Sequence, residues 1–221
     1  MALITHDYYC TKAGMASEFR LLIPDACLHG DREPEGVLFL LPREGESGGS
    51  LILRTGLEAV SDRYQLAVVI PPALNGCFTD MVYGYPFYQS LLYVREYLRT
   101  YFPGLPLVPG KCAIAGIGIS AMAAVRWAAE EPEFFRCAGA ISGLFDPAME
   151  PTDYFTEERL TNLFGDPEMR IAKREAFEKI RQTAENAPGC GVLYLSGDSD
   201  DPDVLREQLR TFVKHVWGGE A

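Results

Sequence analysis

Apolar runs of strand length recur along the chain, and stretches with helical spacing separate them. The runs cover residues 37–41, 66–70, 112–117, 138–141 and 192–195. Nearly continuous apolar runs of this length are typical of strands that are buried on both faces. Strand and helix alternate, and parallel strands need such crossovers. The pattern therefore predicts an α/β fold with a mostly parallel central sheet and helices on both faces.

The remaining elements complete this architecture. Residues 3–9 and 18–23 flank Lys12-Ala13-Gly14 and predict an antiparallel N-terminal hairpin at one edge of the sheet. Helical spacing covers residues 51–64, 88–101, 120–130, 171–185 and 204–217. Proline and glycine punctuate the connections, and none of these is long enough for an interdomain linker. We expect residues 1–221 to form a single domain.

Charge and hydropathy narrow the range of partners. The chain has 31 acidic and 20 basic residues, which gives a formal charge of −11. This charge repels phosphate backbones and anionic bilayers, so we expect neither nucleic acid nor membrane as a partner. No apolar run approaches the roughly 20 residues of a membrane span. The first residues lack a basic start followed by an apolar stretch, which favours the cytoplasm.

The cysteines give no sign of a metal site or a disulfide framework. All six are scattered, without a CxxC pair or a Cys/His cluster. Cys112 and Cys137 lie inside apolar runs, where free cysteine behaves as a small core residue. We expect most of the six to be buried thiols, and we expect no metal and no cofactor.

A strand-to-helix turn carries the motif with most chemical content. Residues 114–124 leave an apolar run and enter an alanine-rich helix, as a G-x-S-x-G nucleophile elbow does. The motif here reads Gly116-Ile117-Gly118-Ile119-Ser120. Small residues stand two before and two after the centre, as close strand–helix packing requires. The centre, however, is glycine.

Five further segments resemble the tributyrin-esterase and S-formylglutathione-hydrolase type of serine esterase. They are residues 76–81, 132–135, 140–146, 162–166 and 193–200. The resemblance implies an α/β-hydrolase fold and a family activity of carboxylic-ester hydrolysis. It puts the nucleophile position at Gly118, the triad acid at Asp200, and the oxyanion region at Ile119 and Arg43. Phe78, Thr79, Asp80 and Met81 would line a pocket.

The chain departs from that family at two further places. Leu41-Pro42-Arg43 stands where the family has a His-Gly pair that supplies an oxyanion-hole amide. Proline has no N–H to donate, and Arg43 is bulky. After Asp200 the family continues with a helix, a strand and a loop that carries the catalytic histidine. The 21 residues that follow Asp200 here predict one amphipathic helix, so the last strand and the histidine loop are expected to be missing.

These residues leave several interpretations of the catalytic groups open. Gly118 tolerates the positive φ of an elbow tip, so the fold can persist while the chemistry is lost and the nucleophile position is only vestigial. Ser120 is a weak alternative nucleophile. If the motif is centred on Ser120 instead of Gly118, Met122 stands two residues after the serine, where a small residue is needed. The other interpretation of Ser120 is a small residue that serves packing or caps a helix. His215 is expected on the surface of the terminal helix. His6 and His29 are expected to be structural or solvated.

Asp200 also has two interpretations. It can be a retained orienting group without a base, or it can belong to the acidic start of the last helix, where carboxylates interact well with the helix dipole. The sequence favours the second.

The sequence leaves open whether the chain is an enzyme. A degenerate esterase would bind a small ester-like ligand or a protein partner at the old site. The alternatives are an active ester hydrolase with an unorthodox site at Ser120, or with a residue borrowed from another subunit, and a binding or scaffold protein. A further hypothesis is a shortened gene product, in which the missing last strand leaves a sheet edge exposed. Such an edge could pair with a second copy in a homodimer.

Overall fold

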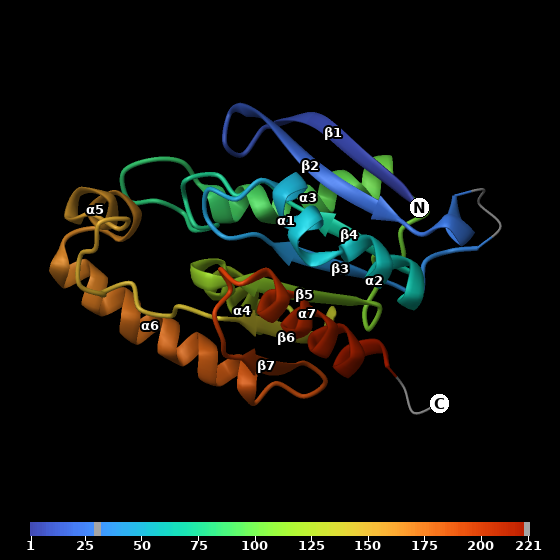
Figure 1. Cartoon of the computed structure of the whole chain (residues 1–221). Coiled ribbons are helices and arrows are strands. Elements are labelled where there is room, and N and C mark those ends of the chain that lie inside the picture. Colours follow the sequence, from blue (N-terminus) through green and yellow to red (C-terminus); the bar gives the residue numbers. More distant parts are fainter. Residues whose placement is uncertain (29–31, 219–221) are drawn as a thin grey trace.

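A mixed sheet of seven strands forms the centre of the computed structural model, which describes residues 1–28 and 32–218 (Figure 1). The strand order is β1-β2-β4-β3-β5-β6-β7. The strands are β1 Ala2–Cys10, β2 Met15–Ile23, β3 Gly36–Leu41, β4 Leu66–Ile70, β5 Cys112–Ile117, β6 Phe135–Ile141 and β7 Gly191–Leu195. β1 pairs antiparallel with β2, and β2 with β4, whereas all later pairs are parallel. The predicted parallel sheet with an N-terminal hairpin at its edge is confirmed.

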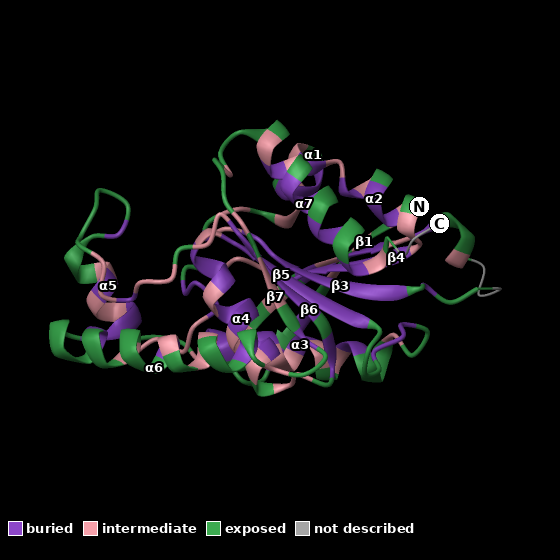
Figure 2. Cartoon of the chain, turned by 90° about the horizontal axis from the view of Figure 1, so that it is seen from below, coloured by how far each residue is buried: buried purple, intermediate pink, exposed green. Residues whose placement is uncertain are grey.

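Helices cover both faces of this sheet, as Figure 2 shows. One face carries α1 Gly48–Thr55, α2 Leu57–Tyr64 and α7 Pro202–Trp217. The other face carries α3 Phe87–Tyr101, α4 Ala121–Glu130 and α6 Pro167–Glu185, while α5 Glu157–Phe164 packs beside α6 beyond the sheet. Short 3-10 turns are η1 Asp25–Cys27 and η2 Gly118–Ser120. Because of this double cover, every residue of β3, β4 and β5 is buried.

The predicted helix over residues 51–64 is wrong as a single element. Gly56 has a φ of +62°, and its N–H donates to the carbonyl of Ile52. This left-handed glycine ends α1 and starts α2 at a new angle. The apolar spacing continues across the break, with Leu57 and Val60 buried on α2, so the pattern alone did not reveal it.

The terminal helix α7 lies against the sheet. Its apolar stripe of Leu205, Leu209, Phe212 and Val216 is buried. A Cβ added to Gly139 of β6 would lie 2.8 Å from the Phe212 ring, so this glycine lets the ring approach the strand. The stripe therefore belongs to the core of the chain. In the part of the chain that the structure describes, β7 pairs only with β6 and forms the sheet edge.

Most of the cysteines are buried, as the sequence predicted. Cys112 and Cys137 are buried, and Cys27 alone of the six cysteines is not. No helix among the described residues has both the length and the apolar character needed to cross a bilayer.

Candidate functional site

The elbow after β5 keeps its backbone shape. β5 ends at Ile117, and η2 leads directly into α4. Gly118 at the tip has a φ of +60°. A Cβ on Gly116 would lie 2.4 Å from the carbonyl oxygen of Ser120, so strand and helix pass too close for any side chain there. The tight strand-to-helix turn is thus formed, with Gly118 at its tip.

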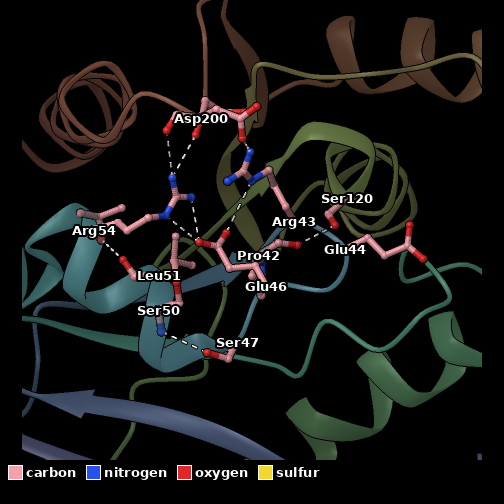
Figure 3. A network of polar contacts seen from close by, with 12 residues as sticks. Pro42, Arg43, Glu44, Glu46, Ser47, Ser50, Leu51, Arg54, Ser120 and Asp200 are labelled. Carbon is pink, nitrogen blue, oxygen red and sulfur yellow. Dashed lines mark hydrogen bonds and ion pairs between the residues drawn. The ribbon is translucent and has the colours of Figure 1, made fainter. Parts of the chain in front are cut away.

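The side chain of Arg43 lies over Gly118 (Figure 3 shows Arg43 and its partners). A Cβ on Gly118 would lie 3.6 Å from Cγ and 3.9 Å from Cδ of Arg43. The guanidinium of Arg43 donates to the carboxylate of Asp200. The structure thus brings three predicted site residues together. A guanidinium stays protonated at neutral pH and has no acceptor, so Arg43 offers no general base here.

Two residues that the sequence did not single out support this pair. Nε of Arg54 donates to Oε1 of Glu46 at 2.9 Å, and its Nη1 reaches the carbonyls of Ser199 and Asp200 at 3.3 and 3.5 Å. Oε2 of Glu46 lies 3.7 Å from Nε of Arg43. Arg54 is on α1, and Glu46 lies in the segment before α1. The network therefore connects the segment between β3 and α1 to the loop that contains Ser199 and Asp200 (Figure 3). No motif marks such partners in the sequence.

The environment of Asp200 differs from that of a buried triad acid. Its side chain is 80% exposed. The hydrogen bond from Arg43, followed by the charge of the same guanidinium, lowers the pKa of Asp200. Asp200 directly precedes Asp201, which caps α7 by accepting from the backbone N–H of Asp203 and Val204, so the acidic segment does stand at the start of the last helix, while the carboxylate of Asp200 itself binds Arg43.

Ser120 is enclosed within the elbow. It is fully buried, and its Oγ–H donates to the carbonyl of Pro42 at 2.7 Å. Ser120 stands at the N-cap position of α4 but makes no side-chain capping hydrogen bond, so its burial fits the packing alternative. The bond instead connects the elbow to the end of β3, and the hydroxyl has no exposed surface.

The described histidines lie away from this site. His6 on β1 places Nε2 2.9 Å from the hydroxyl of Tyr97 on α3. His215 is exposed in the last turn of α7, as predicted, and lines a hollow against α2. His29 is outside the described residues. In residues 1–28 and 32–218, no imidazole lines the space around Gly118.

An open hollow of about 700 Å³ surrounds Gly118. Arg43, Arg54, Glu46 and Asp200 form its polar side. Its remaining lining includes Ile119, Ser142, Tyr154 and Phe155. The space next to Gly118 is therefore open and bordered on one side by charged side chains.

A salt bridge connects the Arg43 loop to α5. Glu44 is buried and forms an ion pair with Arg159. The thiol of Cys77 donates to Oε2 of Glu44, with Sγ at 2.9 Å. Burial, followed by the charge of Glu44, raises the pKa of the Cys77 thiol, so this cysteine is not a reactive thiolate. The predicted pocket segment is thereby held next to the site.

A second, separate space lies behind Ile119, between α4 and α6. This α4–α6 cavity has a volume of about 290 Å³. Phe78, Thr79 and Asp80 of the predicted pocket line it, while Met81 packs against the apolar cluster of α5. Lys173 and Arg126 also line it. The sequence could not find these two, because α4 and α6 meet only in the folded chain.

Comparison with solved structures identifies the fold, whereas comparison of the sequence identifies no family. No protein-family model and no curated protein matches the sequence. Among solved structures, FphF, a fluorophosphonate-binding serine hydrolase of Staphylococcus aureus, matches with a TM-score of 0.75 at 18% identity, over 97% of this chain and 98% of that chain.

Two S-formylglutathione hydrolases are also similar. FrmB from Staphylococcus aureus matches with a TM-score of 0.73 at 19% identity, over 97% of this chain and 98% of that chain. The enzyme from Agrobacterium tumefaciens matches with a TM-score of 0.70 at 12% identity, over 97% and 95%. The chain therefore has the α/β-hydrolase fold that the resemblance implied.

Proposed function

We propose that this α/β-hydrolase-fold chain descends from a serine esterase, has lost serine-hydrolase activity, and serves as a binding protein. Its structural neighbours include serine hydrolases and ferulic acid esterases, which supports the esterase origin. A fold hosts many functions, so the function is argued from the site.

The contact of Arg43 with Gly118 and Asp200 carries the proposal. Acyl transfer needs a nucleophile, a base that takes its proton, and a group that orients the base. Gly118 offers no nucleophile, and Asp200 binds a guanidinium where a triad acid would bind an imidazole. Loss of the nucleophile or the base alone removes nearly all triad-dependent rate, typically several orders of magnitude.

The oxyanion side of the site supports the same conclusion. An oxyanion hole needs backbone N–H groups aimed at the developing charge. Pro42 has no N–H, and its carbonyl already accepts from Ser120. The Arg43 side chain fills the space next to the elbow tip.

The competing candidate is an active hydrolase that uses Ser120, the hydroxyl of the elbow. Its burial and its bond to Pro42 argue against attack on a substrate. Hydrolysis of nitrophenyl acetate and butyrate by the wild-type chain and by Ser120→Ala decides between the two. We expect both to match the buffer rate. Turnover that disappears in Ser120→Ala would establish Ser120 as the nucleophile.

The surfaces that remain favour binding. The Gly118 hollow and the α4–α6 cavity persist although the chemistry is lost, and they could receive a small ester-like ligand or a protein segment. The α7 stripe is buried and so is not available for a homodimer contact, whereas the β7 edge of the sheet is. Free cysteines support the cytoplasm as the proposed location.

A further inference from the structure

The α4–α6 cavity combines an apolar interior with charged side chains in its lining. Ile119, Met122, Phe164 and Phe177 supply apolar surface. Asp80, Arg126 and Lys173 supply charges. An apolar cavity with a few polar groups is the usual form of a small-molecule site, and the charged groups select the head group of the ligand.

Two of the three charges already have partners. Arg126 donates to Glu130 at 2.8 Å and lies 3.7 Å over the ring of Tyr88. Asp80 accepts from the backbone N–H groups of Tyr88 and Gln89 at 3.0 and 3.1 Å, at the start of α3. The charge of each is thus stabilised without a ligand.

Lys173 is the exception. It forms no ion pair with any residue of the described ranges 1–28 and 32–218. Its side chain is half-buried, and this burial lowers its pKa. The charge of Asp80 acts in the opposite direction, but no hydrogen bond or ion pair to Lys173 forms among the described residues, so an anion in the cavity would be its direct partner.

We propose that the α4–α6 cavity binds a small monocarboxylate with an apolar body, whose carboxylate pairs with Lys173 and whose body packs against Ile119, Phe164 and Phe177. Asp80 in the same lining disfavours a second negative charge, which selects a monoanion over a dianion. Lys173 and Arg126 disfavour an amine. The ligand is a free acid, so its binding needs no bond cleavage and is independent of the proposed loss of hydrolysis.

Calorimetric titration of the full chain with four ligands of equal chain length tests the head group. We expect hexanoate to bind at least about tenfold more tightly than hexanol, the gain of one charge-assisted hydrogen bond. Hexyl phosphate and hexylammonium should bind more weakly than hexanoate. Equal affinity for hexanol, tighter binding of either charged analogue, or no binding of hexanoate would each overturn the proposal.

Two variants test the place of binding. Lys173→Met should lower the affinity for hexanoate at least about tenfold. Lys179→Met, on the exposed side of the same helix, should leave it unchanged and serves as the matched control. Ala176→Phe fills the cavity lining at an exposed helix position, so it should fold and lose hexanoate binding.

Wild-type affinity in Lys173→Met, or in a folded Ala176→Phe, would show that hexanoate binds elsewhere. Ester hydrolysis measured on the same samples reports separately on the proposed loss of activity.

Discussion

Replacing Gly118 by serine restores the nucleophile position and tests what the glycine does there. Its φ of +60° lies in the left-handed region, which costs a residue with a Cβ about 1–3 kcal/mol. The nearest atom to the new Cβ is Cγ of Arg43 at 3.6 Å, an ordinary van der Waals contact. The expected loss of unfolding free energy is therefore about 1–3 kcal/mol, and it comes from backbone strain rather than from a clash.

Urea denaturation measures this loss against two glycine controls. Gly110 has a φ of +73° with no neighbour within 4 Å, so Gly110→Ser should cost about as much as Gly118→Ser. Gly104 also has no neighbour within 4 Å, and its φ lies outside the left-handed region, so Gly104→Ser should cost almost nothing. If Gly118→Ser is as stable as Gly104→Ser, the strain assigned to the elbow tip is wrong.

Gly118→Ser should also remain inactive toward nitrophenyl esters. The new hydroxyl would lie beside Arg43, which cannot accept its proton, and no described imidazole reaches it. Ester turnover by Gly118→Ser that exceeds wild type would mean that a base is present at the site.

Three further perturbations test the packing and the charges. Ser120→Ala should lose about 1–3 kcal/mol of unfolding free energy in urea, because it leaves the buried carbonyl of Pro42 without a donor. Phe212→Ala should lose about 3–5 kcal/mol of unfolding free energy, since the ring is fully buried against β6. Leu53→Ala, at an 81% exposed position, should change stability little. A loss for Phe212→Ala as small as that for Leu53→Ala would mean that α7 is a dispensable tail. Because Arg43 lowers the pKa of Asp200 below its unfolded value, any stability from the pair is present above the unfolded pKa and is lost as pH falls through the folded pKa. A titration followed by NMR should show a higher pKa of Asp200 in Arg43→Met than in the wild type, and an unchanged pKa would contradict the pairing.

The sequence predicted the sheet well because burial on both faces leaves a direct signal. β3, β4 and β5 are buried at every position, so each appears as an unbroken apolar run. The break between α1 and α2 was missed, since one left-handed glycine changes the backbone direction without changing the apolar spacing. The helix α5 was missed as well.

The candidate site was predictable only where a local motif defines it. The turn at Gly118 was predicted from residues 114–124, and the loop at Asp200 was predicted from residues 193–200. The contact of Arg43 with Asp200 joins residues 157 positions apart, and no local pattern encodes it. Lys173 reaches its cavity only through the packing of α6 on α4. Sequence reasoning thus identified the turn at Gly118 and did not identify the Arg43 side chain that lies next to it.

Reaction with a fluorophosphonate probe, followed by intact-mass and peptide mass spectrometry, tests the central claim most directly. Such probes label a serine that a neighbouring base activates. FphF, a fluorophosphonate-binding serine hydrolase, serves as the positive control. We expect the chain to keep its unmodified mass under conditions that label FphF completely. A single adduct that maps to Ser120, or to Ser142 in the Gly118 hollow, would show that the site is a working serine hydrolase.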